Sequence, residues 1–347
     1  MINWGVIGAG GIAYRRTIPE GILSAGNSNL TAIQDANTDL ARKIGKEFNV
    51  KVYDKIKDLL SDKTIDAVYI ATPVFLHYKH CMLAAEYKKH ILCEKNLALN
   101  KNQCLEIIKK CKDNKVKLGV GYMMRFNPLN LAIKEAVMEK MLGKIILGRA
   151  QLSCWYPPIK DAWRQQKKLG GGGSLSDMGS HCIDLLEFIF GSKVVEVNCI
   201  VGNIIHDYEV EDTAIVTCKF ENGSIGIVDN CFNIPDNSSK NFLEIYGDKG
   251  SILCKGTIGQ DSKGDAEIII EPVKKNYEAD QKRSDITSGK KFKLKQSNIY
   301  KSEIEYFADC IKKDIEPEIS GELGLHHVRV VEACYESARK AKSIRIN

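Results

Sequence analysis

The sequence predicts two domains, an α/β domain with a doubly wound parallel sheet over residues 1–122 and an α+β domain over residues 123–347. Three observations support this prediction. Strand and helix patterns alternate from residue 2 to 121, which favours a parallel sheet covered by helices. Strand patterns joined by tight turns fill residues 144–255, which favours a wide sheet with antiparallel hairpins. A chain of 347 residues is also long for one core.

Composition excludes several classes of protein. The chain is 44% hydrophobic, and strand-like residues follow Met1 directly, so we expect neither a secretion signal nor a membrane span. The twelve cysteines are scattered without a C-x-x-C pair, which favours reduced thiols in a cytoplasmic protein over disulfides or a zinc site. The net charge of +6 is spread along the chain, so nucleic-acid binding is not expected.

The first motif is a glycine fingerprint at the start of the chain. Gly8, Gly10 and Ala13 form G-x-G-x-x-A between an apolar strand (residues 4–7) and a helix-compatible segment. The first glycine permits the tight turn, the second lets backbone approach a pyrophosphate, and the small third residue lets the helix pack on the strand. Because the strand and helix context is present, the motif predicts a dinucleotide site.

Asp35 follows the second predicted strand, residues 30–34. A carboxylate there can accept hydrogen bonds from the ribose hydroxyls of NAD and would repel the 2′-phosphate of NADP, so NAD is the expected cofactor. The alternative is an ordinary turn residue.

The alternation continues to residue 121. Helices are expected at residues 40–48, 56–60, 78–87 and 101–114, and strands at 50–53, 66–71, 90–93 and 117–121. Ligands bind beyond the carboxyl ends of parallel strands. The polar residues that follow three of these strands are therefore placed at the expected site, namely Thr72 and Pro73 with His77, Glu94 and Lys95, and Tyr122 with Arg125.

Four glycines, residues 170–173, lead into a predicted helix at residues 175–190. Asp177 and His181 are four residues apart on this helix and so share one face. A carboxylate can receive one imidazole N–H and leave the other ring nitrogen free to take a proton. The alternative is a capping aspartate and a buried structural histidine.

These motifs occur together, in this order, in one known family. The fingerprint, Ala71-Thr72-Pro73 with His77, Cys93-Glu94-Lys95 and the glycine run before Asp177 and His181 resemble the glucose–fructose oxidoreductase and inositol dehydrogenase family. The resemblance extends from Ile2 to the C-terminus, and includes Trp163-Arg164 and the helix near Ser337. One departure is Asn96, which stands where the family usually has proline.

The resemblance implies a Rossmann domain followed by a domain with a large, mainly antiparallel open sheet. It also implies that Lys95, Asp177 and His181 flank the nicotinamide and act as catalytic residues. The expected cofactor contacts are Gly8, Gly10, Gly11, Ile12, Ala13, Asp35, Thr72, Pro73, His77, Glu94, Lys95, Arg125, Trp163 and Arg164. The expected substrate contacts are Lys95, Tyr122, Arg125, Asp177 and His181.

The second half predicts a wide sheet with a helix on one face only, so we expect a homodimer or homotetramer. Its strands are expected at residues 144–155, 194–203, 213–220, 224–232, 242–246 and 251–255. The lysine-rich stretch 274–296 favours a surface excursion. His326 and His327 lack a third ligand at metal-binding spacing and are expected to be structural. The last helix, about 322–342, is expected to pack on the first domain.

The expected reaction is NAD-dependent oxidation of a secondary alcohol in a sugar, inositol or glycoside. His181 would take the hydroxyl proton, Asp177 would orient it, and Lys95 would stabilise charge on the reacting oxygen. Lys95 is the alternative base. Two other classes remain open. One is an NAD-dependent glycosidase that works by transient oxidation and elimination, and the other is a non-catalytic NAD-binding regulator, which would not need these three residues.

Overall fold

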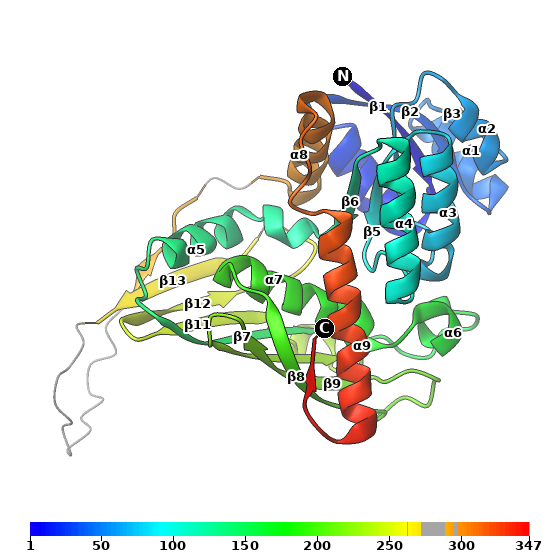
Figure 1. Cartoon of the computed structure of the whole chain (residues 1–347). Coiled ribbons are helices and arrows are strands. Elements are labelled where there is room, and N and C mark those ends of the chain that lie inside the picture. Colours follow the sequence, from blue (N-terminus) through cyan, green and yellow to red (C-terminus); the bar gives the residue numbers. More distant parts are fainter. Residues whose placement is uncertain (262, 272–288, 295–296, 347) are drawn as a thin grey trace, which may run out of the picture.

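The computed structural model describes residues 1–261, 263–271, 289–294 and 297–346, and the lysine-rich stretch 274–296 lies mostly outside them. Figure 1 shows two sheets, each with its own helices, joined through the middle of the molecule. The predicted fold class is confirmed, with one parallel sheet and one large, mostly antiparallel sheet.

The first sheet contains six strands in the order β3-β2-β1-β4-β5-β6, and all of its pairs are parallel. This order is that of the doubly wound dinucleotide-binding fold, in which ligands bind at the carboxyl ends of the strands. The strands are β1 (Ile2–Ile7), β2 (Ser28–Gln34), β3 (Lys51–Val52), β4 (Ala67–Ile70), β5 (His90–Glu94) and β6 (Leu118–Gly121).

Helices cover both faces of this sheet. On one face lie η1 (Ala13–Ile22), α1 (Thr38–Glu47) and α8 (Ile299–Lys313), and on the other lie α2 (Ile56–Ser61), α3 (Val74–Glu86) and α4 (Lys101–Asn114). Helix α8 was not predicted. It comes from the far end of the chain, and its Phe307 ring lies 5.9 Å from that of Trp4 on β1. The first domain is therefore completed by a late segment of the chain.

The second sheet has nine strands in the order β14-β13-β12-β11-β7-β10-β9-β8-β15. Among the described strands of this second sheet, β7 and β10 form the one parallel pair and the other pairs are antiparallel. The strands are β7 (Ile145–Ser153), β8 (Val194–Gly202), β9 (Thr213–Phe220), β10 (Ile225–Cys231), β11 (Phe242–Gly247), β12 (Gly250–Lys255), β13 (Asp265–Ile270), β14 (Lys290–Lys291) and β15 (Ile344–Arg345).

One face of this second sheet packs on helices. The covering elements are α5 (Pro128–Met138), which was not predicted, and the continuous pair η4 (Leu175–Gly179) and α7 (Ser180–Phe190). The side chains of β9 alternate between buried and exposed, as a strand with one covered face requires. The opposite face exposes large apolar side chains, which are Ile200, Ile215, Ile225 and Leu253.

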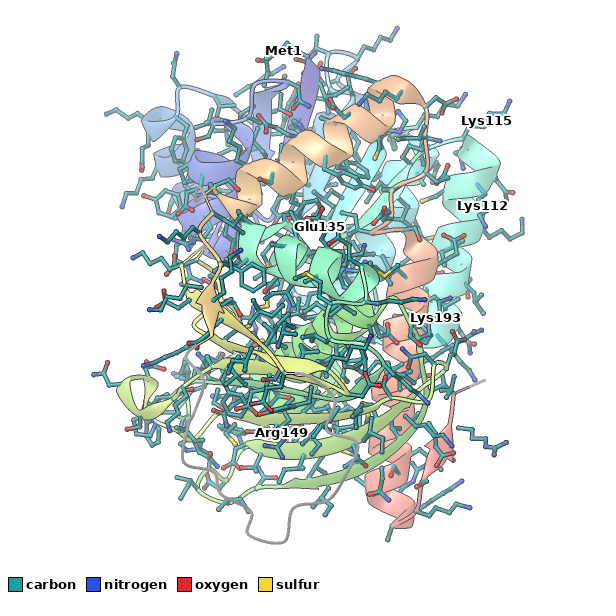
Figure 2. All side chains as sticks on the ribbon, turned by 90° about the vertical axis from the view of Figure 1, so that its left-hand side faces the viewer. Met1, Lys112, Lys115, Glu135, Arg149 and Lys193 are labelled. Carbon is teal, nitrogen blue, oxygen red and sulfur yellow. The ribbon has the colours of Figure 1, made fainter. Side chains whose placement is uncertain are left out.

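Helix α9 (Gly321–Lys340) extends from the first domain along the second, and it contacts α4 and β6 of the first domain and β8 of the second (Figure 1). Figure 2 shows charged side chains on separate elements of the surface, such as Lys112 on α4, Glu135 on α5 and Arg149 on β7. None of the described helices is long and apolar enough to cross a membrane. Helix α3 begins at Val74, earlier than predicted, so His77 lies inside its first turn.

Candidate active site

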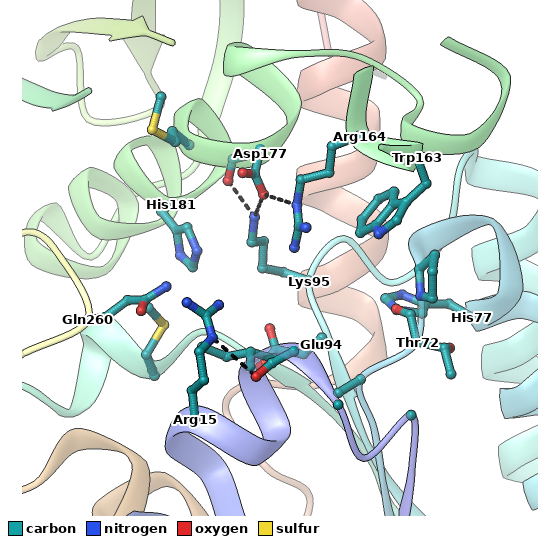
Figure 3. A pocket seen from close by; sticks show the side chains of 18 of the residues that line it. Arg15, Thr72, His77, Glu94, Lys95, Trp163, Arg164, Asp177, His181 and Gln260 are labelled. Carbon is teal, nitrogen blue, oxygen red and sulfur yellow. Dashed lines mark hydrogen bonds and ion pairs between the residues drawn. The ribbon is translucent and has the colours of Figure 1, made fainter. Parts of the chain in front are cut away.

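A cavity of about 750 Å³ lies where the carboxyl edge of the parallel sheet meets η4, α7 and the end of β7 (Figure 3). Its size is within the range of small-molecule and cofactor pockets, roughly 300–1,000 Å³. Most of the residues expected from the sequence line it, which are Gly8, Gly10, Gly11, Ile12, Asp35, Thr72, Pro73, His77, Glu94, Lys95, Trp163, Arg164, Asp177 and His181. Ala13 is fully buried beneath the turn, where a small residue lets helix and strand approach.

The glycine fingerprint forms the tight turn that its sequence predicts. Gly8 has a φ of +82°, and a Cβ on it would lie 2.9 Å from the backbone nitrogen of Thr72. The backbone N–H of Gly10 donates to the carboxylate of Asp35 at 2.9 Å. Gly10, Gly11 and Ile12 line the cavity and η1 follows them directly, so the start of this helix lies at the cavity, where a dinucleotide phosphate would bind.

Lys95 and Asp177 join the two domains across the cavity. Lys95 follows strand β5, and its ammonium Nζ lies 2.8 Å from Asp177 Oδ1 on η4 and also donates to the main-chain oxygen of Asp177. Arg164 Nε lies 3.6 Å from the same carboxylate oxygen. Burial alone would raise the pKa of Asp177, but Lys95 and Arg164 outweigh it and hold this pKa well below its usual value. The carboxylate is therefore ionised in the working pH range.

The structure corrects one expectation about Asp177. Its carboxylate bonds to Lys95, and no hydrogen bond to His181 is found, although both residues face the cavity. The buried His181 Nδ1 has no partner among the described residues. Burial, followed by the Lys95 charge, lowers the pKa of His181 well below its ordinary 6.5, and the Asp177 carboxylate opposes this only in part. At neutral pH the imidazole is therefore uncharged and able to accept a proton.

Two contacts fix the helix start that carries Asp177. The buried Glu211 carboxylate accepts hydrogen bonds from the N–H groups of Gly173 and Leu175, at 2.9 and 3.0 Å, and from the Tyr335 hydroxyl at 2.8 Å. The Asn96 side chain donates to the main-chain oxygen and the hydroxyl of Ser176, at 3.0 Å each. The Lys95–Asn96 peptide bond is cis. Asn96 thus tethers the loop after β5 to the opposite domain.

His77 belongs to the loop scaffold. Its Nδ1 lies 2.8 Å from the carbonyl oxygen of Asn96, and its Nε2 lies 2.7 Å from that of Thr72. Burial lowers the pKa of His77 to about 4, although both carbonyl contacts favour the protonated ring. The side chain links the loop after β4 to the loop after β5, and both loops line the cavity.

Tyr122 and Arg125, expected to contact ligands, are turned away from the cavity. Both are buried, and neither lines it. The short helix η2 (Met123–Phe126) follows β6 and presents Met123 and Met124 to the cavity instead. The Arg125 guanidinium bonds to the buried carboxylate of Asp184 on α7, with its shortest contact at 2.6 Å. A buried carboxylate requires such a partner, so Arg125 serves packing.

His326 and His327 both bond to Glu187 near the end of α7. Their Nε2 atoms lie 2.7 and 2.8 Å from its two carboxylate oxygens. Burial would raise the pKa of Glu187, but the two histidines lower it well below its usual value. No group of three potential metal ligands occurs among the described residues. The pair connects α9 to α7.

Several lining residues were missed by sequence reasoning. Arg15 lies in the first turn of η1, two residues beyond the fingerprint, and that position is the only signal that pointed to it. Figure 3 shows Arg15 and Gln260 pointing into the cavity from opposite domains. Ser153, Cys154, Asp236 and Asn241 come from the end of β7 and the loop after β10, and no sequence motif marks them.

Comparison with protein families identifies the two domains separately. Residues 2–122 match the model of an oxidoreductase family's NAD-binding Rossmann fold, and residues 134–346 match that family's C-terminal alpha/beta domain. The chain belongs to the glucose–fructose oxidoreductase and inositol dehydrogenase family. The resemblance noted in the sequence is thereby confirmed.

Relatives in this oxidoreductase family differ in activity. Myo-inositol 2-dehydrogenase of Thermotoga maritima is 27% identical over 99% of this chain and 98% of its own length. A 2,7-anhydro-N-acetylneuraminate hydratase of Escherichia coli is 27% identical over 73% of this chain and 67% of its own. The solved structure of levoglucosan dehydrogenase with NADH and levoglucosan is 22% identical, with a TM-score of 0.85 and 99% of both chains covered.

Replacing Arg125 tests whether it is structural. In Arg125→Met the Asp184 carboxylate stays buried without its main partner, so the free energy of unfolding should fall by about 3–5 kcal/mol in urea titration. Dinucleotide affinity of the folded variant should be unchanged. Arg149→Met is the matched control, because Arg149 pairs with Glu244 at the surface, where such pairs contribute about 0–1 kcal/mol. A variant that is equally stable but binds the dinucleotide more weakly would show that Arg125 contributes to the binding site.

Proposed function

We propose that this protein is an NAD-dependent dehydrogenase that oxidises a secondary alcohol of a sugar, inositol or glycoside. The observation that carries the proposal is the convergence of Lys95, Asp177 and His181 on the cavity that the glycine turn also lines. Bound NAD would supply the hydride acceptor. It would be held by the fingerprint turn, Asp35 and the loops at Thr72 and Glu94.

His181 is the proposed general base. Its uncharged imidazole can take the hydroxyl proton at neutral pH. Lys95 Nζ lies 2.8 Å from Asp177 Oδ1, and its positive charge would stabilise negative charge on the reacting oxygen. Asp177 therefore acts through Lys95, which differs from the role expected from the sequence. Because Lys95 is paired with Asp177, we favour His181 over Lys95 as the base.

The wall opposite the fingerprint suits a polyol. Ser153, Asp236 and Asn241 place short polar side chains at this wall. Two of them are oriented by backbone, because Asp236 accepts from the Trp155 N–H at 3.0 Å and Asn241 from the Ser153 N–H at 2.9 Å. Their remaining polar atoms offer donors and acceptors to ring hydroxyls. Dehydrogenation of inositol by a family member agrees with this choice of substrate class.

An NAD-dependent elimination is the second candidate. It would oxidise the substrate transiently, eliminate a group and return the hydride, so no NADH would accumulate. The hydratase among the relatives favours keeping it, and the same three residues could serve it. A non-catalytic regulator is the least favoured reading, since it would not require Lys95, Asp177 and His181 together.

We also propose that the protein forms a homodimer or homotetramer through the uncovered face of the second sheet. Ile200 is 71% exposed and Ile215 is 48% exposed on that face. Exposed apolar patches of this kind mark interaction sites. Light scattering that gave only a monomer would contradict the proposal.

The twelve free cysteines also fit the cytoplasmic location expected from the sequence.

Absorbance at the NADH band tests the proposed function directly. The protein should reduce NAD with at least one compound from a panel of inositols, hexoses and O- and C-glycosides. Glycoside cleavage that needs NAD but yields no net NADH would establish the elimination instead. Dinucleotide binding with neither reaction would favour the regulator.

Asp35 should make the protein prefer NAD. We expect NAD to bind at least about tenfold more tightly than NADP, which corresponds to about 1.4 kcal/mol, because the carboxylate repels a 2′-phosphate. Asp35→Ser should reduce this ratio. Quenching of tryptophan fluorescence measures both affinities, with Asp39→Ser on the exposed side of α1 as the control. Equal or tighter NADP binding to the unchanged protein would refute the prediction.

Lys95→Ala should lower kcat by about 10²-fold or more, as the loss of one positioned polar group commonly does. Cofactor affinity, followed by fluorescence, should change little. Lys101→Ala is the control, since Lys101 is exposed at the start of α4. Near-normal turnover of Lys95→Ala would show that the end of β5 is only structural.

The pH profile tests His181 as the base. Because the pKa of His181 is lowered, kcat/KM for oxidation should stay level through neutral pH and fall only below about pH 6.5, where the imidazole becomes protonated. His181→Ala should lose most turnover, together with this acid limb. Asp177→Asn should retain the limb, at the same or lower pH, because it removes a carboxylate that favours imidazolium. A limb that survives in His181→Ala would assign the base elsewhere.

A further inference from the structure

Residues 256–261 cross from the second domain to the first beside the cavity. They follow β12, and their first residues are held in place by contacts with the second domain. The carbonyl oxygen of the buried Thr257 accepts hydrogen bonds from the Asn127 and Asn130 side chains, at 3.4 and 3.3 Å, and Ile258 packs in the core of the second domain. The start of this segment therefore belongs firmly to the second domain.

The far end of the segment is held by Arg16 of the first domain. The Arg16 guanidinium donates to the main-chain oxygen of Gln260 and to the Asp261 carboxylate. Arg16 is itself fixed on η1, where it pairs with Glu20 at 2.9 Å and lies 5.5 Å from the centre of the Tyr300 ring. Since η1 follows the fingerprint directly, the segment is fastened next to the glycine turn.

Between these two ends, Gly259 and Gln260 line the cavity. Gly259 has a φ of +150°, a conformation that favours glycine, and this brings backbone to the cavity wall. Gln260 lines the cavity beside Arg15, and the two side chains come from different domains (Figure 3). A dinucleotide lying along the glycine turn would be enclosed between η1 and this segment.

We propose that residues 256–261 form a clasp over the bound dinucleotide, with Gln260 as a cofactor-binding residue and the Arg16–Asp261 pair as its fastening. The inference rests on the proposed dinucleotide site. The pair is partly exposed, at 23% for the Arg16 side chain and 59% for that of Asp261. Such pairs are weak and are screened by salt, so this one slows release without preventing it.

The test is the rate of NADH dissociation from the full-length protein, followed by stopped-flow fluorescence. Arg16→Ala and Asp261→Ala should each raise the dissociation rate about three- to fivefold at low salt, the range expected for a partly exposed pair. The double variant should be no faster than Arg16→Ala, because that change already breaks the pair with Asp261. High salt should remove most of the difference from the unchanged protein.

Gln260→Ala should also weaken NADH binding, but it should keep the effect of salt, because the Arg16–Asp261 pair remains. Asp265→Ala is the matched control, since Asp265 is exposed on β13 and does not line the cavity. Thermal melting of each variant separates a local effect from lost folding, and Asp261→Ala changes only an exposed side chain.

The outcomes distinguish the clasp from the dinucleotide site. Unchanged dissociation rates in Arg16→Ala and Asp261→Ala, or effects that add in the double variant, would overturn the clasp and leave the proposed function intact. Failure of the unchanged protein to bind either NADH or NADPH would overturn both.

Discussion

The contact between Lys95 and Asp177 determines how the two domains meet. Each side chain comes from a different domain, and their charged atoms lie 2.8 Å apart at the cavity wall. A largely buried ammonium group is costly without a partner, so the end of β5 and the start of η4 must come together. Glu211 and Asn96 also hold the start of η4 in place, because each makes a hydrogen bond to the backbone close to Asp177. These contacts hold the end of β5 against the start of η4 at the wall of the cavity.

One side of the helix formed by η4 and α7 carries four ionisable residues with two different tasks. Asp177 and His181 line the cavity, whereas Asp184 and Glu187 are buried against Arg125 and the two histidines of α9. Asp184 and Glu187 both have charged or hydrogen-bonding partners, and these contacts hold the helix in one orientation. Burial and the nearby Lys95 charge lower the pKa of the His181 imidazole, so it remains uncharged.

The sequence predicted the parts of the site that follow from topology. Polar residues after parallel strands must gather at one edge, and Thr72, Lys95 and the glycine turn do so. It failed where a local turn or a distant partner decided the outcome. Tyr122 and Arg125 follow β6, but η2 turns them inward, and Asp184 captures the guanidinium. Asp177 has the spacing to reach His181, yet Lys95, from another domain, takes its carboxylate.

The origin of α8 has a consequence for how the protein is made. Strands β1 and β2 end by residue 34, yet the helix that packs against Trp4 spans residues 299–313. Until that helix leaves the ribosome, part of one face of the first sheet, around Trp4, exposes apolar side chains. The nascent Rossmann domain must therefore wait, incompletely folded, while nearly the whole second domain is synthesised. A chain cut short before α8 would be a target for chaperones and for aggregation.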